Sequence, residues 1–187
     1  MNRGFTARDI TLTAMFTAIT VVAAMLVRYA GPIVPFSLLP FVAMLAGGVL
    51  GARLGSLCFV VYILIGLVGV PVFATAPFGG PAYILKPTFG FLLGFACSAY
   101  VIGYILERSE TRSLIRYIMA MLAGILVYNA IGIPYLYAML VFYMGGSYSL
   151  MQVLVIGFFP FFALDLVKGL AAAFLAMAVA KRLKDNL

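Results

Sequence analysis

Apolar runs close to the thickness of a membrane dominate this sequence. The first covers residues 10–27 and is closed by Arg28. As a helix it would be roughly 27 Å long, about the thickness of the hydrocarbon core of a bilayer. Runs of this length and polarity predict transmembrane helices. We therefore expect an all-α integral membrane protein.

The overall composition supports this interpretation. Of the 187 residues, 66% are hydrophobic and 9% are charged, and the mean hydropathy is +1.20. About a quarter of the residues in soluble domains are charged, so this composition excludes a soluble globular protein. Because the chain is too short for an additional soluble domain, we expect residues 1–187 to form a single membrane domain.

Proline, glycine and polar turns divide the chain into six expected transmembrane helices. Pro32 and Pro35 interrupt the chain after the first helix, and residues 51–53 form the turn after the second. The helix near Pro134 is expected to be bent or broken. The predicted helices cover residues 10–27, 38–50, 54–70, 87–106, 114–143 and 153–180.

The longest interruption, residues 72–86, contains two glycines and two prolines but is otherwise mostly apolar. Gly and Pro at this density predict an irregular backbone. Since an apolar loop is unlikely to project into water, we expect it to fold over the membrane helices as a cap. The aromatic residues of the loops are interpreted as membrane-interface residues.

The basic residues predict the orientation of the chain. With six helices both termini lie on one side, and nine of the twelve basic residues then fall on that side. Lys168 lies inside the last apolar run, and only Arg28, expected to anchor the end of the first helix, and Lys86 fall on the other side. Such a bias places the termini in the cytoplasm. The net charge of +7 is therefore a signal of topology and does not indicate nucleic-acid binding.

Few residues are suited to catalysis or metal binding. The chain has no histidine, and every acid except Asp165 is expected at the cytoplasmic surface beside basic residues. Cys58 and Cys97 lie in apolar runs and are interpreted as buried small residues. Catalytic dyads, metal clusters and phosphate-binding loops are missing. We expect no enzyme activity, no cofactor and no metal.

One acid and one base stand inside the last apolar run. Asp165 and Lys168 are three residues apart, so both leave the same face of a helix. Charges in a membrane are costly and usually functional, so the pair is expected to face a polar site. The alternative is that the two residues only neutralise each other and hold the helix in place.

The position of this pair suggests a pocket on the outer side. Asp165 precedes Lys181 by sixteen residues, roughly 24 Å along a helix, which places it in the outer third of the bilayer. Lys86 approaches from the same side, although its side chain could instead extend to the interface. Small residues, Ala172 and Ala176, follow below the pair. This pattern favours an outward-facing pocket closed at its inner end over a pore.

Small residues also line one face of the first helix. Ala14 and Ala18 have the spacing that lets two helices approach closely. They could serve packing within this chain or contact with a partner.

Several segments together resemble the BioY family, the biotin-capturing S-components of energy-coupling factor (ECF) vitamin transporters. The matching segments cover most of the chain in the order typical of that family. They are 34–38 (VPFSL), 45–55 (LAGGVLGARLG), 66–74 (GLVGVPVFA), 79–90 (GGPAYILKPTFG) and 160–168 (PFFALDLVK). Leu39 and Phe89 depart from the family's pattern, which more often has Gln and Gly there.

The resemblance implies a function and a set of contacts. Asp165 and Lys168 would hold the polar ring system of biotin, and Lys86 would receive its carboxylate. Ala14 and Ala18 would dock on a transmembrane coupling subunit that works with two ATPase subunits in a bacterial plasma membrane. The full set of candidate ligand-binding residues is Asp165, Lys168, Lys86, Tyr83, Ser37, Phe36, Thr75 and Asn129.

Two other functions remain open from the sequence. The same architecture could capture another vitamin, such as riboflavin or thiamine. A membrane scaffold without a small ligand would belong to a different class of protein.

Overall fold

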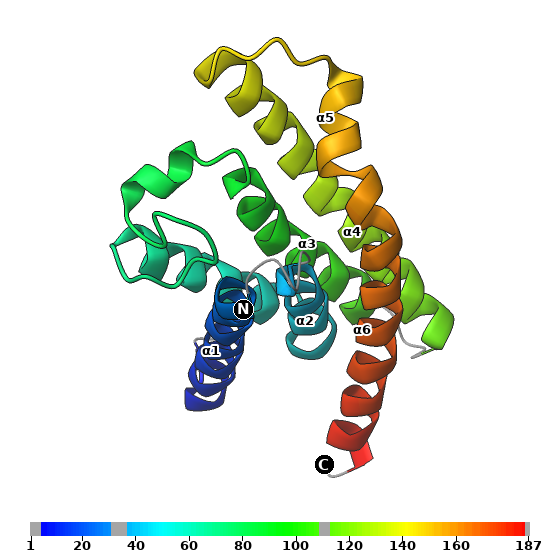
Figure 1. The fold of residues 1–187 in the computed structure, drawn as a ribbon. Helices are drawn as coiled ribbons and strands as arrows, with labels where there is room; N and C mark the ends of the chain where they lie inside the picture. Colours follow the sequence, from blue (N-terminus) through cyan, green and yellow to red (C-terminus); the bar gives the residue numbers. More distant parts are fainter. Residues whose placement is uncertain (1–4, 31–36, 109–112, 186–187) are drawn as a thin grey trace.

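A computed structural model describes residues 5–30, 37–108 and 113–185, and all regular secondary structure in these ranges is helical (Figure 1). A 3-10 helix, η2 (Pro81–Leu85), and a π-helical turn, η3 (Met139–Tyr143), accompany the α-helices. This confirms the all-α expectation. The α-helices are α1 (Ala7–Ala30), α2 (Leu39–Leu67), α3 (Phe89–Glu107), α4 (Leu114–Ala138), α5 (Leu150–Gly157) and α6 (Phe159–Asp185).

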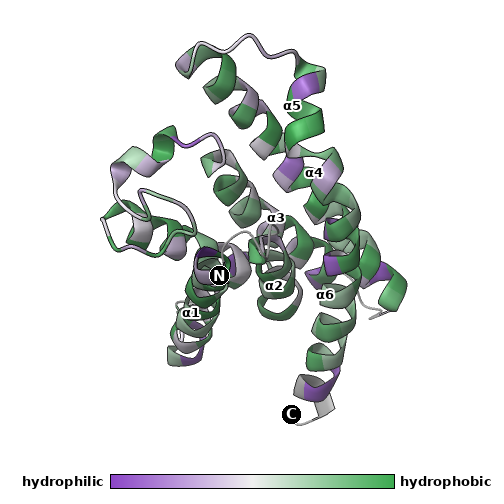
Figure 2. Ribbon diagram, in the orientation of Figure 1, coloured by the Kyte–Doolittle hydropathy of each residue, from purple (hydrophilic) through white to green (hydrophobic). Residues whose placement is uncertain are grey.

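Five helical segments in the described ranges are long and apolar enough to cross a membrane. They are Ala7–Tyr29, Leu39–Leu67, Phe89–Glu107, Leu114–Tyr143 and Phe159–Arg182. Figure 2 shows hydrophobic colour along most of each helix and hydrophilic colour in short patches. The expected number of six differs from this count because the second and third predicted helices are joined in α2.

The chain nevertheless folds back inside α2. Gly51 has φ 83° and ψ −178°, which are not helical angles. A Cβ on Gly55 would lie 2.9 Å from the carbonyl atoms of Ala46. Along a straight helix nine residues span about 13.5 Å, so the two halves of α2 must lie against each other. The predicted turn is therefore present, although it is reduced to Gly51.

A carboxylate from another helix caps the N-terminus of the second half of α2. The backbone N–H of Ala52 donates a hydrogen bond of 2.8 Å to Oε1 of Glu107 at the end of α3. Negative groups stabilise the N-terminus of a helix because free N–H groups point outward there. Glu107 was expected only to face solvent, and the structure corrects this: it is exposed but caps a helix.

Glycines on α3 allow its neighbours to approach closely. A Cβ on Gly94 would lie 2.8 Å from the backbone oxygen of Tyr128 in α4, and one on Gly103 would lie 2.0 Å from the backbone nitrogen of Ala52. The central pair of α2 and α3 is therefore packed through its backbone. Helix α1 lies on one side of this pair, and α4 and α6 lie on the other (Figure 1).

The last predicted helix is divided in two. Phe158, with φ −119° and ψ −63°, separates α5 from α6. Pro160 follows in the first turn of α6, where its missing N–H is tolerated. A capping box in which Ser149 and Gln152 exchange side-chain to backbone hydrogen bonds begins α5.

Small residues on α6 continue the face that carries Asp165 and Lys168. Ala172 and Ala176 are fully buried, and a Cβ added to Gly48 of α2 would lie 2.8 Å from the Cβ of Ala176. The expected close packing below the charged pair is confirmed. Of the two cysteines, Cys58 is buried as expected, whereas Cys97 is exposed.

Candidate functional site

Asp165 and Lys168 form an ion pair on α6. The ammonium Nζ of Lys168 lies 2.9 Å from Oδ1 of Asp165. The side chains are 7% and 16% exposed, for Asp165 and Lys168 respectively. The spacing of three residues predicted that both side chains leave the same face of the helix, and the structure confirms this.

A second donor reaches the same carboxylate from another helix. The hydroxyl of Tyr128 on α4 donates a 2.5 Å hydrogen bond to Oδ2 of Asp165. Among the described residues, each carboxylate oxygen thus has one donor. Since an ionised carboxylate offers about four lone-pair sites, it retains capacity for further donors.

Tyr128 was not among the predicted site residues. Tyrosine in an apolar helix is an ordinary core residue, and Tyr128 is separated from Asp165 by 37 positions. Only the packing of α4 on α6 brings the two together. The neighbouring residue, Asn129, was among the predicted ligand-binding residues. Asn129 is buried, and its Nδ2 donates to the carbonyl of Ile125 at 2.8 Å.

The loop between α2 and α3 carries another pair of predicted residues. The hydroxyls of Thr75 and Tyr83 lie 3.0 Å apart. Tyr83 is 4% exposed and stacks on Phe73, with ring centroids 4.0 Å apart. Loop aromatic residues were expected at the membrane interface, and this is wrong for Phe73 and Tyr83, which are buried in the protein.

Burial raises the pKa of the Tyr83 phenol, and the hydrogen bonds from Thr75 partly oppose this shift. The hydroxyl of Tyr83 therefore stays protonated at physiological pH and can both donate and accept. The loop is packed onto the helices as predicted: Tyr62 of α2 donates to the carbonyl of Val72 at 3.2 Å.

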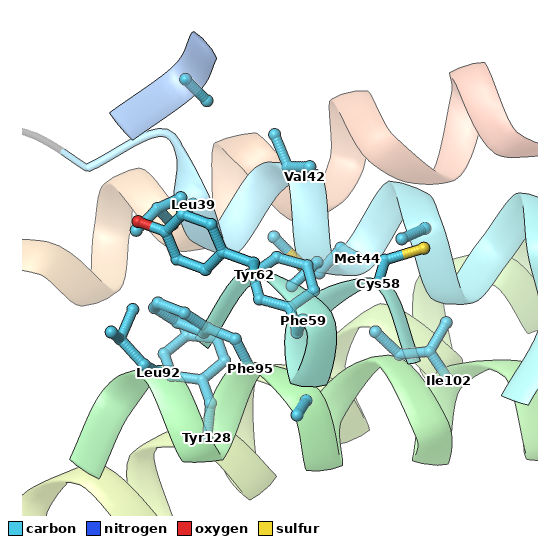
Figure 3. Close-up of a cluster of buried hydrophobic side chains, with 14 of the residues drawn as sticks. Leu39, Val42, Met44, Cys58, Phe59, Tyr62, Leu92, Phe95, Ile102 and Tyr128 are labelled. Carbon is cyan, nitrogen blue, oxygen red and sulfur yellow. The ribbon is translucent and has the colours of Figure 1, made fainter. Parts of the chain in front are cut away.

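A continuous series of ring contacts connects this loop to Tyr128. It passes through the core cluster, in which Figure 3 labels Tyr62, Phe59, Phe95 and Tyr128. A second branch joins Tyr83 to Phe89 and then to Tyr135 on α4. The loop and the carboxylate of Asp165 therefore belong to one packed unit. Centroid distances along the first branch are 4.0 Å (Tyr83–Phe73), 5.6 Å (Phe73–Tyr62), 6.4 Å (Tyr62–Phe59), 6.1 Å (Phe59–Phe95) and 5.2 Å (Phe95–Tyr128).

The remaining predicted ligand-binding residues lie near the ends of helices. Lys86 is half-buried at the junction of η2 and α3, where its backbone bonds with Tyr83 and Phe89. Ser37 accepts a 3.2 Å hydrogen bond from the N–H of Leu39 at the start of α2. Phe36 lies outside the described residues. The described contacts do not join Lys86 or Ser37 to Asp165.

Arg28 connects α1 to the loop after α2. Its guanidinium lies 3.7 Å from the ring centroid of Phe78 and donates a 3.4 Å hydrogen bond to the carbonyl of Pro71. The sequence predicted an anchor for the end of the first helix. The structure shows that the partner of this anchor is the loop of residues 71–80.

The predicted alanine stripe lies on the outside of α1. Ala14 and Ala18 are exposed, whereas Thr17 is buried and donates to the carbonyl of Cys58 at 3.2 Å. The stripe therefore faces away from α2. Within the part of the chain that the structure describes, these alanines are not buried against another helix, which favours contact with a partner over packing within the chain.

Comparisons with known proteins point to a single family. The sequence model of the BioY family matches residues 1–185. A probable biotin transporter BioY of Lysinibacillus sphaericus is 40% identical over 168 residues, covering 90% of this chain and 84% of that protein. The biotin transporter BioY of Thermotoga maritima is 36% identical over 174 residues, covering 93% and 96%.

The fold has a counterpart among solved structures. The crystal structure of the S-component for biotin from an ECF-type ABC transporter matches with a TM-score of 0.74. The match covers 95% of both chains at 22% sequence identity, and therefore shows that the two proteins share a fold.

Proposed function

The chain belongs to the BioY family, and we propose that it captures biotin outside the cell and delivers it across the membrane with an ATP-driven ECF module. It is a multi-pass protein of the cell membrane. As a member of a transporter family, it is not an enzyme. The observation that carries the proposal is a buried carboxylate held by two donors in a chain that matches this family from residue 1 to 185.

The chemistry of biotin fits the candidate residues. Its cyclic urea has two N–H donors and one C=O acceptor. Asp165 would accept from the urea N–H groups through the lone pairs that Lys168 and Tyr128 leave free. The ammonium of Lys168 would donate to a ligand oxygen, and Lys86 would bind the carboxylate of the aliphatic tail.

The loops would complete the pocket on the outer side. Tyr83 and Thr75 offer hydroxyls beside aromatic surface, and Asn129 offers an amide next to Tyr128. Phe36 and Ser37 would contribute from the segment between α1 and α2. Aromatic rings suit the apolar sulfur ring of biotin.

We assign both termini to the cytoplasm and six crossings to the chain. The two halves of α2, which lie against each other on either side of Gly51, would be the second and third crossings. The exposed face with Ala14 and Ala18 would dock on the transmembrane coupling subunit, which works with two ATPase subunits.

A binding experiment tests the proposed function directly. The purified protein in detergent is titrated with labelled biotin, and unlabelled thiamine and riboflavin are offered as competitors. We expect saturable binding of biotin that neither competitor displaces. Absence of biotin binding, or displacement by either of the other vitamins, would contradict the proposal.

A further inference from the structure

The carboxylate of Asp165 receives two donors that differ in rigidity. Lys168 lies on the same helix, and its ammonium stands at the end of four methylenes. Tyr128 approaches from α4 with a stiff side chain that has only two rotatable bonds, and the residue is 2% exposed. The tyrosine is therefore the donor that can fix the position of the carboxylate.

Both the ring and the backbone of Tyr128 are held by α3. Phe95 of α3 packs edge-on against the ring, with centroids 5.2 Å apart and an interplanar angle of 67°. Gly94, also on α3, lets the backbone of Tyr128 come so close that a Cβ would lie 2.8 Å from its carbonyl oxygen. The hydroxyl is thus placed by two helices, α3 and α4, against a third, α6.

Without the hydroxyl, Lys168 is the one donor to the carboxylate that remains in the described part of the chain. Asp165 could then turn both oxygens toward the ammonium of Lys168, since the two residues lie on one face of α6. Such a closed pair would use lone pairs and N–H groups that a ligand needs. A neutral hydroxyl on Oδ2 prevents this closure and adds no charge.

We propose that Tyr128 is a positioning residue, whose hydroxyl holds Asp165 open so that the carboxylate and Lys168 can both bind the ligand. This inference rests on the proposed function, in which Asp165 contacts biotin. Tyr128 acts through Asp165 and does not need to touch the ligand. The ring contributes packing, and the hydroxyl contributes the position.

The Tyr128→Phe variant separates these two contributions because it removes the oxygen and keeps the ring. We expect biotin affinity to fall about tenfold, the size expected for one hydrogen bond to a charged group. The thermal midpoint in detergent should stay close to that of the wild type. Tyr117→Phe is a matched control, since Tyr117 is also buried on α4, and its biotin affinity should not change.

A double-variant cycle shows whether the hydroxyl acts through Asp165. In an Asp165→Asn background, Tyr128→Phe should cause no further loss of biotin affinity. Independent, additive losses would overturn the proposal. A normal affinity of Tyr128→Phe beside an impaired Asp165→Asn would also overturn it and leave the proposed function intact. Failure of the wild type to bind biotin would instead contradict the function itself.

A second pair of variants keeps the test decisive if Tyr128→Phe does not fold. Tyr128→Gln loses the ring but keeps a hydrogen-bond donor, whereas Tyr128→Leu keeps neither. We expect Tyr128→Gln to bind biotin more tightly than Tyr128→Leu. Equal affinities would show that only packing matters at this position and would overturn the proposal.

Discussion

At the scale of single residues, the carboxylate of Asp165 is costly to bury in a membrane protein, and we assign it a specific role in binding biotin. It is buried on a helix in which Asp165 and Lys168 are the two charged residues between positions 159 and 180, and each of its oxygens accepts a hydrogen bond. Replacing one acceptor oxygen with an NH₂ group would leave a donor facing either Lys168 or Tyr128. Breaking a buried pair in this way leaves the other charge without its partner.

We therefore predict that Asp165→Asn weakens biotin binding more than tenfold, which corresponds to above about 1.4 kcal/mol. Titration of the purified variant with biotin measures this. Glu107→Gln is the control, because it makes the same acid-to-amide change at an exposed helix cap and keeps an acceptor for Ala52. If the Asp165→Asn variant and the wild type bind biotin with equal affinity, Asp165 is not part of the biotin site.

The sequence predicted Asp165 and Lys168 because helical periodicity alone puts them on one face. It did not predict Tyr128, because nothing local distinguishes a tyrosine that bonds a carboxylate from one that fills a core. It also could not place Phe73 and Tyr83 inside the protein. Their burial depends on how the loop folds back onto Tyr62 and Phe89, and such long-range contacts are not encoded in a local pattern.

At the scale of elements, hydropathy predicted most helices to within a few residues. A helix that crosses lipid must be apolar along its full length, so its ends are marked by polar or irregular residues. The break at Phe158 was missed because the apolar run continues across it. The sequence predicted a turn at Gly51. It could not predict that Glu107 caps the helix that follows this turn, because that contact depends on the packing of α2 on α3.

The turn at Gly51 predicts a specific loss of stability. The angles φ 83° and ψ −178° are accessible essentially to glycine only, and a Cβ would lie 2.0 Å from Oε1 of Glu107. Gly51→Ala would strain the backbone and displace the cap, so we expect the free energy of unfolding to fall by about 2–4 kcal/mol.

Thermal unfolding in detergent measures this effect, and Gly145→Ala separates its two causes. Gly145 also has a positive φ, 68°, but no atom lies within 4 Å of a Cβ built there. That variant should lose only the backbone term, about 1–2 kcal/mol. If Gly51→Ala proves no more destabilising than Gly145→Ala, the contact with Glu107 has no energetic role.

Replacing Arg28 is expected to change the dynamics of the loop of residues 71–80. Its guanidinium lies over Phe78 and bonds the carbonyl of Pro71, so it restrains residues 71–80 from α1. A partly exposed cation–π contact contributes about 0.5–1 kcal/mol. In Arg28→Gln we expect the backbone amides of residues 72–80 to exchange with deuterium about two- to fivefold faster.

Hydrogen exchange followed by mass spectrometry resolves this segment. Arg108→Gln is a suitable control, because the guanidinium of Arg108 also stacks on a ring, Tyr104, but at the far end of α3. It should leave the exchange of residues 72–80 unchanged. The same rate in Arg28→Gln as in the wild type would show that other contacts hold the loop.

At the scale of the whole molecule, two surfaces have to be kept distinct. Large apolar side chains are exposed on most helices and suit contact with lipid tails. The stripe with Ala14 and Ala18 on α1 is exposed as well, but its side chains are small. Lipid fills a surface of any shape, whereas small residues are favoured where another helix must come close.

This contrast leads to a prediction about transport. Ala14→Arg should leave biotin binding by the isolated protein unchanged, because the stripe lies on the opposite side of α1 from the residues that pack on α2. It should abolish biotin uptake by cells that also produce the coupling subunit and the ATPase subunits. Uptake at the wild-type rate would contradict the docking role of this face.

The control must account for the cost of placing an arginine in a membrane. Ala178 on α6 is exposed and lies seven residues before the end of its helix, as Ala14 lies seven residues after the start of α1. An arginine can extend to the interface from either depth. If Ala178→Arg supports uptake and Ala14→Arg does not, the loss belongs to the alanine face. If both variants lose uptake equally, the charge alone explains the defect and the face has no special role.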